Sequence, residues 1–161
     1  AGELETVKQM IQTGADVDYQ FPKLWGGGTA LLIASEFGHD RVLHALLEAG
    51  ANVNKLSSGG WSPLHNACTR GRVKAVKALI AAGAQLDLLV SGFGLSPFDV
   101  ACISGNDSCV KVMIEVAGVD VNNSSDPRKP LRTPLFLACE KGCSMVGQTL
   151  LNHHADPDKG H

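Results

Sequence analysis

Four copies of a short tetrapeptide that begins with a hydroxyl side chain recur along this chain at a nearly constant period. They are Thr29-Ala30-Leu31-Leu32, Ser62-Pro63-Leu64-His65, Ser96-Pro97-Phe98-Asp99 and Thr133-Pro134-Leu135-Phe136. Their leading residues lie 33, 34 and 37 residues apart. Self-similarity at this period is the sequence signature of stacked repeats. The chain is therefore expected to form a solenoid and not a closed globule.

Fixed offsets from each leading hydroxyl predict a two-turn helix in every copy. An alanine follows five residues later, and a glycine follows nine residues later, at Gly38, Gly71, Gly105 and Gly142. A serine or threonine can accept a hydrogen bond from the free amides of the first turn, and proline suits the next position. Glycine readily takes the left-handed conformation that ends a helix.

Apolar residues after each of these glycines predict a second helix. The eighth residue after the glycine is Leu46, Leu79, Met113 or Leu150, and positions four and nine are mostly apolar. This spacing places the side chains on one face of a helix. A second glycine closes this helix twelve residues after the first, at Gly14, Gly50 and Gly83. In the next copy it falls one residue later, at Gly118, and in the last copy His154 replaces it.

The same template fits the start of the chain, from Gly2 to Gly14. This opening copy lacks a first helix, so it is expected to be a partial repeat, left by a longer array or by loss of a capping segment. All variation in length falls between a closing glycine and the next tetrapeptide, where the gaps are 15, 12, 13 and 15 residues. Glycine-rich turns in these gaps predict hairpin-like fingers. Insertions of this kind gather on one face of a solenoid, often its binding face.

These motifs resemble the ankyrin-repeat family, whose pattern is a turn, Thr-Pro-Leu-His, a helix, Gly, a second helix and Gly-Ala-Asp-Val-Asn. The matching segments are Ser62-Pro63-Leu64-His65, Gly14-Ala15-Asp16-Val17-Asp18 and Gly50-Ala51-Asn52-Val53-Asn54. The resemblance covers Gly2 to Asp158 and implies an all-α ankyrin-repeat solenoid of helix-turn-helix units with β-hairpin-like fingers. It also implies a structural hydrogen-bonding role for His65.

We expect one domain over 1–161, with a partial repeat at 1–18 and four repeats at about 19–54, 55–87, 88–122 and 123–158. Three departures from the family pattern fall in the last repeat. Leu131 replaces a finger glycine, His154 replaces a helix-ending glycine, and Gly147 lies in the middle of a helix, where glycine costs about 1 kcal/mol relative to alanine. The last repeat is therefore expected to be the loosest.

The resemblance implies a protein–protein interaction module that binds a peptide or a folded partner. The resemblance implies that its contact surface lies at the finger tips and at the ends of the first helices. Several of these positions carry aromatic or arginine side chains, the residue types that dominate binding energy. The candidate residues are Trp25, Glu36, Phe37, Trp61, Thr69, Arg70, Phe93, Leu95, Ile103, Arg132, Glu140 and Lys141. The alternative for Trp25 and Trp61 is that each ring packs on the stem of a neighbouring finger.

The charge pattern bears on the partner. The net charge is −2, which gives no indication of nucleic-acid binding, and no apolar run is long enough to span a membrane. Basic residues without acidic ones occupy 55–82, and three more lie in the last finger at Arg128, Lys129 and Arg132. A solvated helix face explains most of this pattern, and an acidic or phosphorylated partner segment is the alternative. The chain is expected to be monomeric on its own.

No constellation of residues predicts catalysis, so we expect no enzyme, no cofactor and no metal. The histidines are scattered over different repeats, and Cys139 and Cys143 lack a second ligand pair nearby. Cys68, Cys102 and Cys139 share one repeat position and are expected to be small buried side chains in a reduced compartment, cytoplasmic or nuclear. A second interpretation makes the chain a regulatory or targeting region of a larger channel, ubiquitin-ligase adaptor or signalling enzyme.

Overall fold

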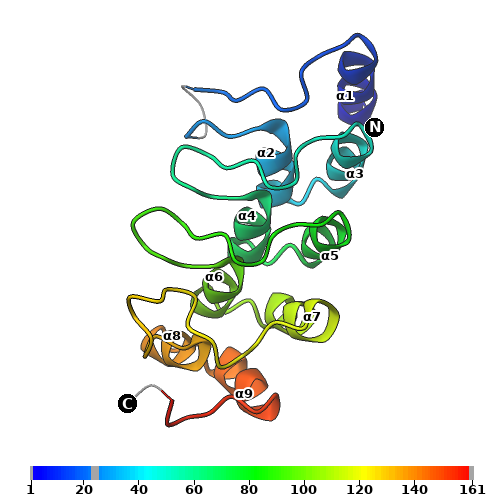
Figure 1. Cartoon of the computed structure of the whole chain (residues 1–161). Coiled ribbons are helices and arrows are strands. Elements are labelled where there is room, and N and C mark those ends of the chain that lie inside the picture. Colours follow the sequence, from blue (N-terminus) through cyan, green and yellow to red (C-terminus); the bar gives the residue numbers. More distant parts are fainter. Residues whose placement is uncertain (1, 23–25, 160–161) are drawn as a thin grey trace.

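The computed structural model describes residues 2–22 and 26–159 as a stack of helix pairs in two rows (Figure 1). The inner row, which lies next to the projecting loops, contains α2 (Ala30–Phe37), α4 (Pro63–Thr69), α6 (Pro97–Ile103) and α8 (Pro134–Glu140). The outer row contains α1 (Gly2–Gln12), α3 (Asp40–Glu48), α5 (Val73–Ala81), α7 (Asp107–Ala117) and α9 (Ser144–Asn152). The predicted all-α solenoid is confirmed.

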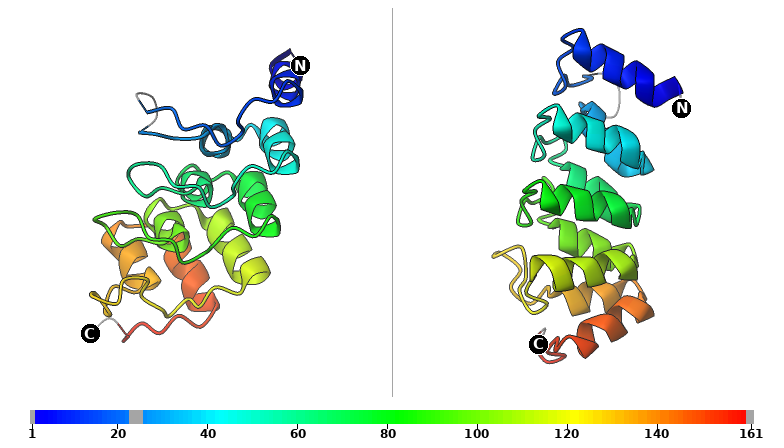
Figure 2. Two further views of the ribbon diagram at one scale, coloured as in Figure 1. Left: turned by 45° about the horizontal axis from the view of Figure 1, so that its top comes forward. Right: turned by 90° about the vertical axis from the view of Figure 1, so that its right-hand side faces the viewer.

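Helices of one repeat pack against each other, and equivalent helices of successive repeats pack side by side. Inner helices contact one another in the order α2, α4, α6 and α8, and outer helices in the order α1, α3, α5, α7 and α9. The turned views in Figure 2 show the same succession along the length of the stack. None of the described helices combines the length and the apolar character that crossing a bilayer requires.

The predicted helix ends form as the sequence indicates. The side chain of Ser62 accepts a hydrogen bond from the amide of His65, and the amide of Ser62 donates to Nδ1 of His65, so the two residues form a capping box. Thr29, Ser96 and Thr133 cap the other inner helices in the same way through their side-chain oxygens. The closing glycines adopt positive φ, for example 71° at Gly38 and 82° at Gly50.

The core runs between the two rows. Leu46, Leu79, Met113 and Leu150, which share the eighth position of the outer helices, are all buried. Met10 holds this position in α1 but is 55% exposed, since no inner helix of its own repeat lies beside α1 in the described part of the chain.

The prediction that Cys139 is buried is wrong. Cys68 and Cys102 are fully buried, whereas Cys139 is exposed. The following repeat covers Cys68, whose Sγ lies 3.6 Å from Sδ of Met113. Within residues 2–22 and 26–159 no repeat follows α9, so the same position in α8 stays open to solvent.

The fingers are hairpin-like loops, and hydrogen bonds join neighbouring fingers to one another. The amide of Ser57 donates to the carbonyl of Trp61, and that of Val90 donates to Leu95, so each finger folds back on itself. The amide of Ser91 also donates to the carbonyl of Gly59 in the preceding finger. At Gly60 an added Cβ would lie 2.8 Å from the Ser91 amide nitrogen, and this close approach requires glycine. The described residues contain no β-strand, so the fingers are loops.

The last repeat keeps the fold despite its departures from the pattern. His154 takes the left-handed conformation of the glycine it replaces, with φ at 66°. The finger in which Leu131 replaces a glycine is organised by Asp126, whose carboxylate accepts hydrogen bonds from the amide and the guanidinium of Arg128. The bonds from Arg128 lower the pKa of Asp126 to about 2.

Candidate functional site

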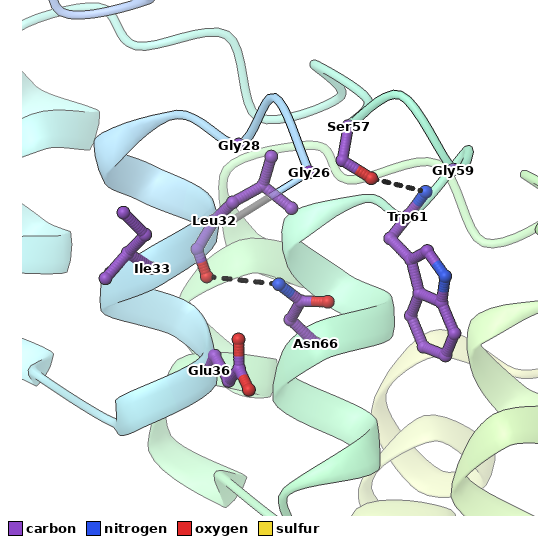
Figure 3. A pocket seen from close by; sticks show the side chains of 9 residues that line it. All are labelled: Gly26, Gly28, Leu32, Ile33, Glu36, Ser57, Gly59, Trp61 and Asn66. Carbon is purple, nitrogen blue, oxygen red and sulfur yellow. Dashed lines mark hydrogen bonds between the residues drawn. The ribbon is translucent and has the colours of Figure 1, made fainter. Parts of the chain in front are cut away.

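A groove lies between α2 and α4, beneath the finger that joins the two repeats (Figure 3). Its cavity has a volume of about 270 Å³. Gly26, Gly28, Leu32, Ile33, Glu36, Ser57, Gly59, Trp61 and Asn66 line it. The mixture of apolar, amide and carboxylate side chains suits the binding of a polypeptide segment with both kinds of group.

A hydrogen bond joins the two walls of this groove, and a second one shapes the finger above it. Nδ2 of Asn66 in α4 donates to the carbonyl of Leu32 in α2 over 3.3 Å. Oγ of Ser57 accepts from the amide of Trp61 over 3.2 Å, which shapes the base of the finger above. The groove is thus formed before any partner arrives, and a preformed site avoids part of the entropic cost of binding.

An ion pair between repeats marks the lower end of the groove. Nη2 of Arg70 lies 2.7 Å from Oε1 of Glu36, and Nε of Arg70 bonds to the same oxygen. A second cavity of about 210 Å³ is lined by Glu36, Trp61, Asn66, Thr69 and Arg70. Three of these residues also line the first cavity, so the two cavities form one continuous surface, which we call the α2–α4 groove.

Trp61 lines the groove and also packs against a buried residue of its own repeat. Its side chain borders both cavities, yet the residue is only partly exposed. Its ring meets the ring of His65 edge-on, with the centroids 5.8 Å apart. This ring contact lies within one repeat, so partner contact and packing on the stem of a neighbouring finger both stay predictions for Trp61.

His65 supports the site from within. It is fully buried, and burial lowers its pKa to about 4. Because Nδ1 accepts from the Ser62 amide, the proton lies on Nε2, which donates to the carbonyl of Leu95 over 3.1 Å. The backbone of Leu95 thereby ties the finger that contains Val90 and Leu95 to α4, in agreement with the structural role predicted for His65.

The remaining predicted contact residues fall into separate places. Phe37, at the end of α2, is 40% exposed and stacks on His39 with centroids 6.1 Å apart. Ile103 is partly exposed at the end of α6, and its carbonyl accepts from Sγ of Cys143. Glu140 and Lys141 are exposed at the end of α8. Trp25 lies outside the described residues.

Phe93 and Arg132 come together at the finger edge, away from the α2–α4 groove. Phe93 is 63% exposed in the finger between Val90 and Leu95, and its carbonyl accepts from Nη1 of Arg132 over 3.4 Å. The structure adds two exposed apolar residues here that the sequence reasoning missed, Leu131 and Phe136. Phe136 stands in the position that His65 holds in its own repeat, where an aromatic ring alone gives no sign of exposure.

The buried cysteine thiols of the described chain are weakly acidic. Burial raises the pKa of the Cys109 thiol to about 11, and it also raises the pKa values of Cys68 and Cys102, which makes all three poor nucleophiles. Across residues 2–22 and 26–159 no three His, Cys, Asp or Glu side chains gather as metal ligands would.

The chain matches the family described as "Ankyrin repeats (3 copies)" over residues 1–90 and again over 85–160. The crystal structure of the human ASB11 ankyrin repeat domain superposes with a TM-score of 0.80 at 28% sequence identity. The match covers 96% of this chain and 66% of that one.

Two longer proteins contain similar segments. The nuclear factor NF-kappa-B p105 subunit of Gallus gallus is 40% identical over 161 residues, which cover 96% of this chain. Protein phosphatase 1 regulatory subunit 12A of Mus musculus is 35% identical over 98 residues, which cover 61% of this chain. The matched segments make up only 16% and 9% of those two proteins.

Proposed function

The chain belongs to the ankyrin-repeat family, and from this premise we propose that it binds a protein partner through the α2–α4 groove. Ankyrin repeats are protein-interaction modules. The observation that carries the proposal is the continuous surface in which Glu36, Trp61, Thr69 and Arg70 meet across two repeats. Four of the residues proposed from sequence thus share one groove.

The chemistry of the groove favours an extended segment with both polar and apolar side chains. The partly exposed Ile33 supplies apolar wall, while Glu36 and Arg70 supply one charge of each sign at the end of the groove. The side chain of Arg70 is 55% exposed, so its ion pair contributes at most about 1 kcal/mol to folding. A partner's carboxylate can therefore compete for the guanidinium at little cost to the fold.

We extend the proposal to the organisation of the chain. The repeats are assigned to about 19–54, 55–87, 88–122 and 123–158 after a partial repeat at 1–18, all in one domain over 1–161. Ankyrin repeat domains are generally non-enzymatic, and we assign this one no catalytic role. A monomeric state and a cytoplasmic or nuclear location belong to the same proposal.

A second candidate function is regulation or targeting within a larger protein. It is favoured by the small share of each long relative that the chain matches, 16% and 9%, and by the name of the second relative, which is a regulatory subunit. In that case the groove would hold a segment of the same polypeptide or of a bound subunit. The surface and its chemistry are the same in both functions.

The test blocks the groove without disturbing the core. In the double variant Thr69→Arg and Arg70→Ala, a long side chain fills the cavity of about 210 Å³ and the cation at its edge is lost. The matched control places similar changes on exposed positions of the outer row, Lys77→Ala in α5 and Ser108→Arg in α7.

Proteins captured from extract by the parent chain are identified by mass spectrometry, produced separately and titrated against all three forms. We expect at least a tenfold loss of affinity for the groove variant and none for the control. Equal affinity of the groove variant and the parent for every captured protein would reject the α2–α4 groove as the binding surface.

A further inference from the structure

We propose that the end of the stack formed by the last finger and α8 is a second docking site, for an acidic polypeptide segment that carries an apolar side chain. The proposal rests on the proposed function, because it treats the chain as an interaction module. A cavity of about 500 Å³ opens at this end of the molecule. Its lining comes from one stretch of the chain: Arg128, Lys129, Pro130, Leu131, Arg132 and Phe136.

Phe136 forms the apolar part of this site because of its place in the repeat. The equivalent residues of the preceding inner helices, Leu32, His65 and Asp99, are at most 2% exposed, whereas Phe136 is 47% exposed. His65 is covered by the next finger, through the bond from its Nε2 to Leu95. In the described part of the chain no finger lies over Phe136.

Leu131 extends the apolar surface, since it lines the same cavity and is 52% exposed. Covering these side chains with a partner would remove apolar surface from water, which favours binding. Two of them next to each other can therefore anchor one large apolar side chain of a ligand.

The rim of the cavity is basic. Lys129 is exposed and makes no ion pair with any described residue. Arg128 is held by the buried carboxylate of Asp126 over 2.8 and 3.0 Å, and Arg132 bonds to the carbonyl of Phe93 and lies within electrostatic range of the buried Asp99. Three cations thus face two buried carboxyl groups, and an incoming carboxylate would meet a net positive charge.

This combination favours an acidic segment over other occupants. If two copies of the chain met through this end, the Lys129 and Arg132 side chains of one copy would face the same basic surface of the other. Such like-charge contacts are unfavourable. The whole chain carries a net charge of −2, which provides no general electrostatic attraction for nucleic acid. A carboxylate of the partner would pair with the basic rim, and an apolar side chain of the partner would pack on Phe136.

The test uses fluorescence anisotropy with a labelled peptide in which a central leucine is flanked by glutamates. One control peptide replaces the glutamates with glutamine, and another replaces the leucine with serine. The parent chain is compared with Lys129→Glu, with Phe136→Ser and with Lys77→Glu, which makes the same charge change in the outer row. Thermal unfolding of each variant shows whether the fold is retained.

We expect the leucine–glutamate peptide to bind the parent with an affinity that falls as salt is added, and both control peptides to bind at least tenfold more weakly. Lys129→Glu and Phe136→Ser should each weaken binding about tenfold, whereas Lys77→Glu should leave it unchanged. Equal binding of the glutamine peptide would overturn the acidic partner. Equal losses for Lys77→Glu and Lys129→Glu would overturn the location.

Two further results would replace the proposed occupant. A dimer in light scattering that dissociates on Phe136→Ser would identify a second copy of the chain. A labelled oligonucleotide that binds as tightly as the peptide and responds to Lys129→Glu would identify nucleic acid. Each of these failures is separate from failure of the α2–α4 groove, which is tested at Thr69 and Arg70 and not at this end.

Discussion

His65 and Asp99 occupy the same position in successive inner helices, and each accepts a hydrogen bond from the amide of its capping serine. Nδ1 of His65 accepts from Ser62 over 3.2 Å, and Oδ2 of Asp99 accepts from Ser96 over 3.0 Å. The outer ends of the two side chains differ. Nε2 of His65 donates to the next finger, whereas Oδ1 of Asp99 has no hydrogen-bond partner among the described residues. One repeat position therefore gives two opposite responses to pH.

Acid should weaken the fold through His65. Its folded pKa of about 4 lies below the ordinary value of 6.5, so the stability it contributes is present above pH 6.5 and is lost as the pH falls toward 4. Protonation of Nδ1 would remove the acceptor of the Ser62 amide and place two N–H donors next to each other. We expect about 3 kcal/mol of unfolding free energy to be lost over this interval. Urea titrations at a series of pH values measure it.

The matched pair for this measurement is His65→Gln and His44→Gln, which remove a buried and an exposed imidazole respectively. The slope of stability against pH between 6.5 and 4 should be shallower in His65→Gln than in His44→Gln. Equal slopes would show that His65 is not the group responsible.

Asp99 should respond in the opposite direction. Burial raises its pKa above 3.8 and outweighs the opposing effects of Ser125, Ser96 and Arg132. The folded state therefore binds the proton more tightly than the unfolded state, and the contribution of Asp99 to stability falls as the pH rises from 3.8 through the folded pKa. Asp99→Asn should gain stability relative to the parent as the pH increases from 4 to 7. Asp87→Asn, at an exposed finger position, is the control. A gain that stays constant with pH would contradict this account.

Gly147→Ala should stabilise the last repeat by about 1 kcal/mol, because alanine removes the entropic cost of glycine within α9. An added Cβ at this position meets only Cδ1 of Leu135, at 3.9 Å, which is an ordinary contact. Differential scanning calorimetry measures the change. Destabilisation would mean that the packing of α8 on α9 leaves no room for the methyl group.

His154→Gly should also stabilise the chain, by about 1 kcal/mol, because glycine takes positive φ without the strain that a Cβ introduces. The carbonyl of His154 accepts from Nδ2 of Asn122, and this backbone bond survives the substitution. Gly50→Ala tests the same principle in reverse, since Gly50 has φ at 82° and an added Cβ there would meet open space. Chemical denaturation of the two variants should give changes of opposite sign.

Local features of this chain were predictable because they depend on neighbours in sequence. Ser62 with Pro63 starts a helix by satisfying free amides, and Gly38 ends one by adopting positive φ. Both effects operate within a single turn of the backbone. The repeat period, the helix pairs, the caps and the structural role of His65 were therefore all accessible from sequence, the last through the family resemblance.

Burial and contact between repeats were decided only by the tertiary structure. Cys68 and Cys139 share a repeat position, but the next repeat covers only the first of them, and Phe136 is exposed where His65 is buried. The ion pair of Glu36 with Arg70 joins residues that are 34 apart in sequence. In a stack, each helix pair is shielded by the pair beside it, so the environment of a side chain depends on which neighbour is present. The period of the pattern carries no information about that neighbour.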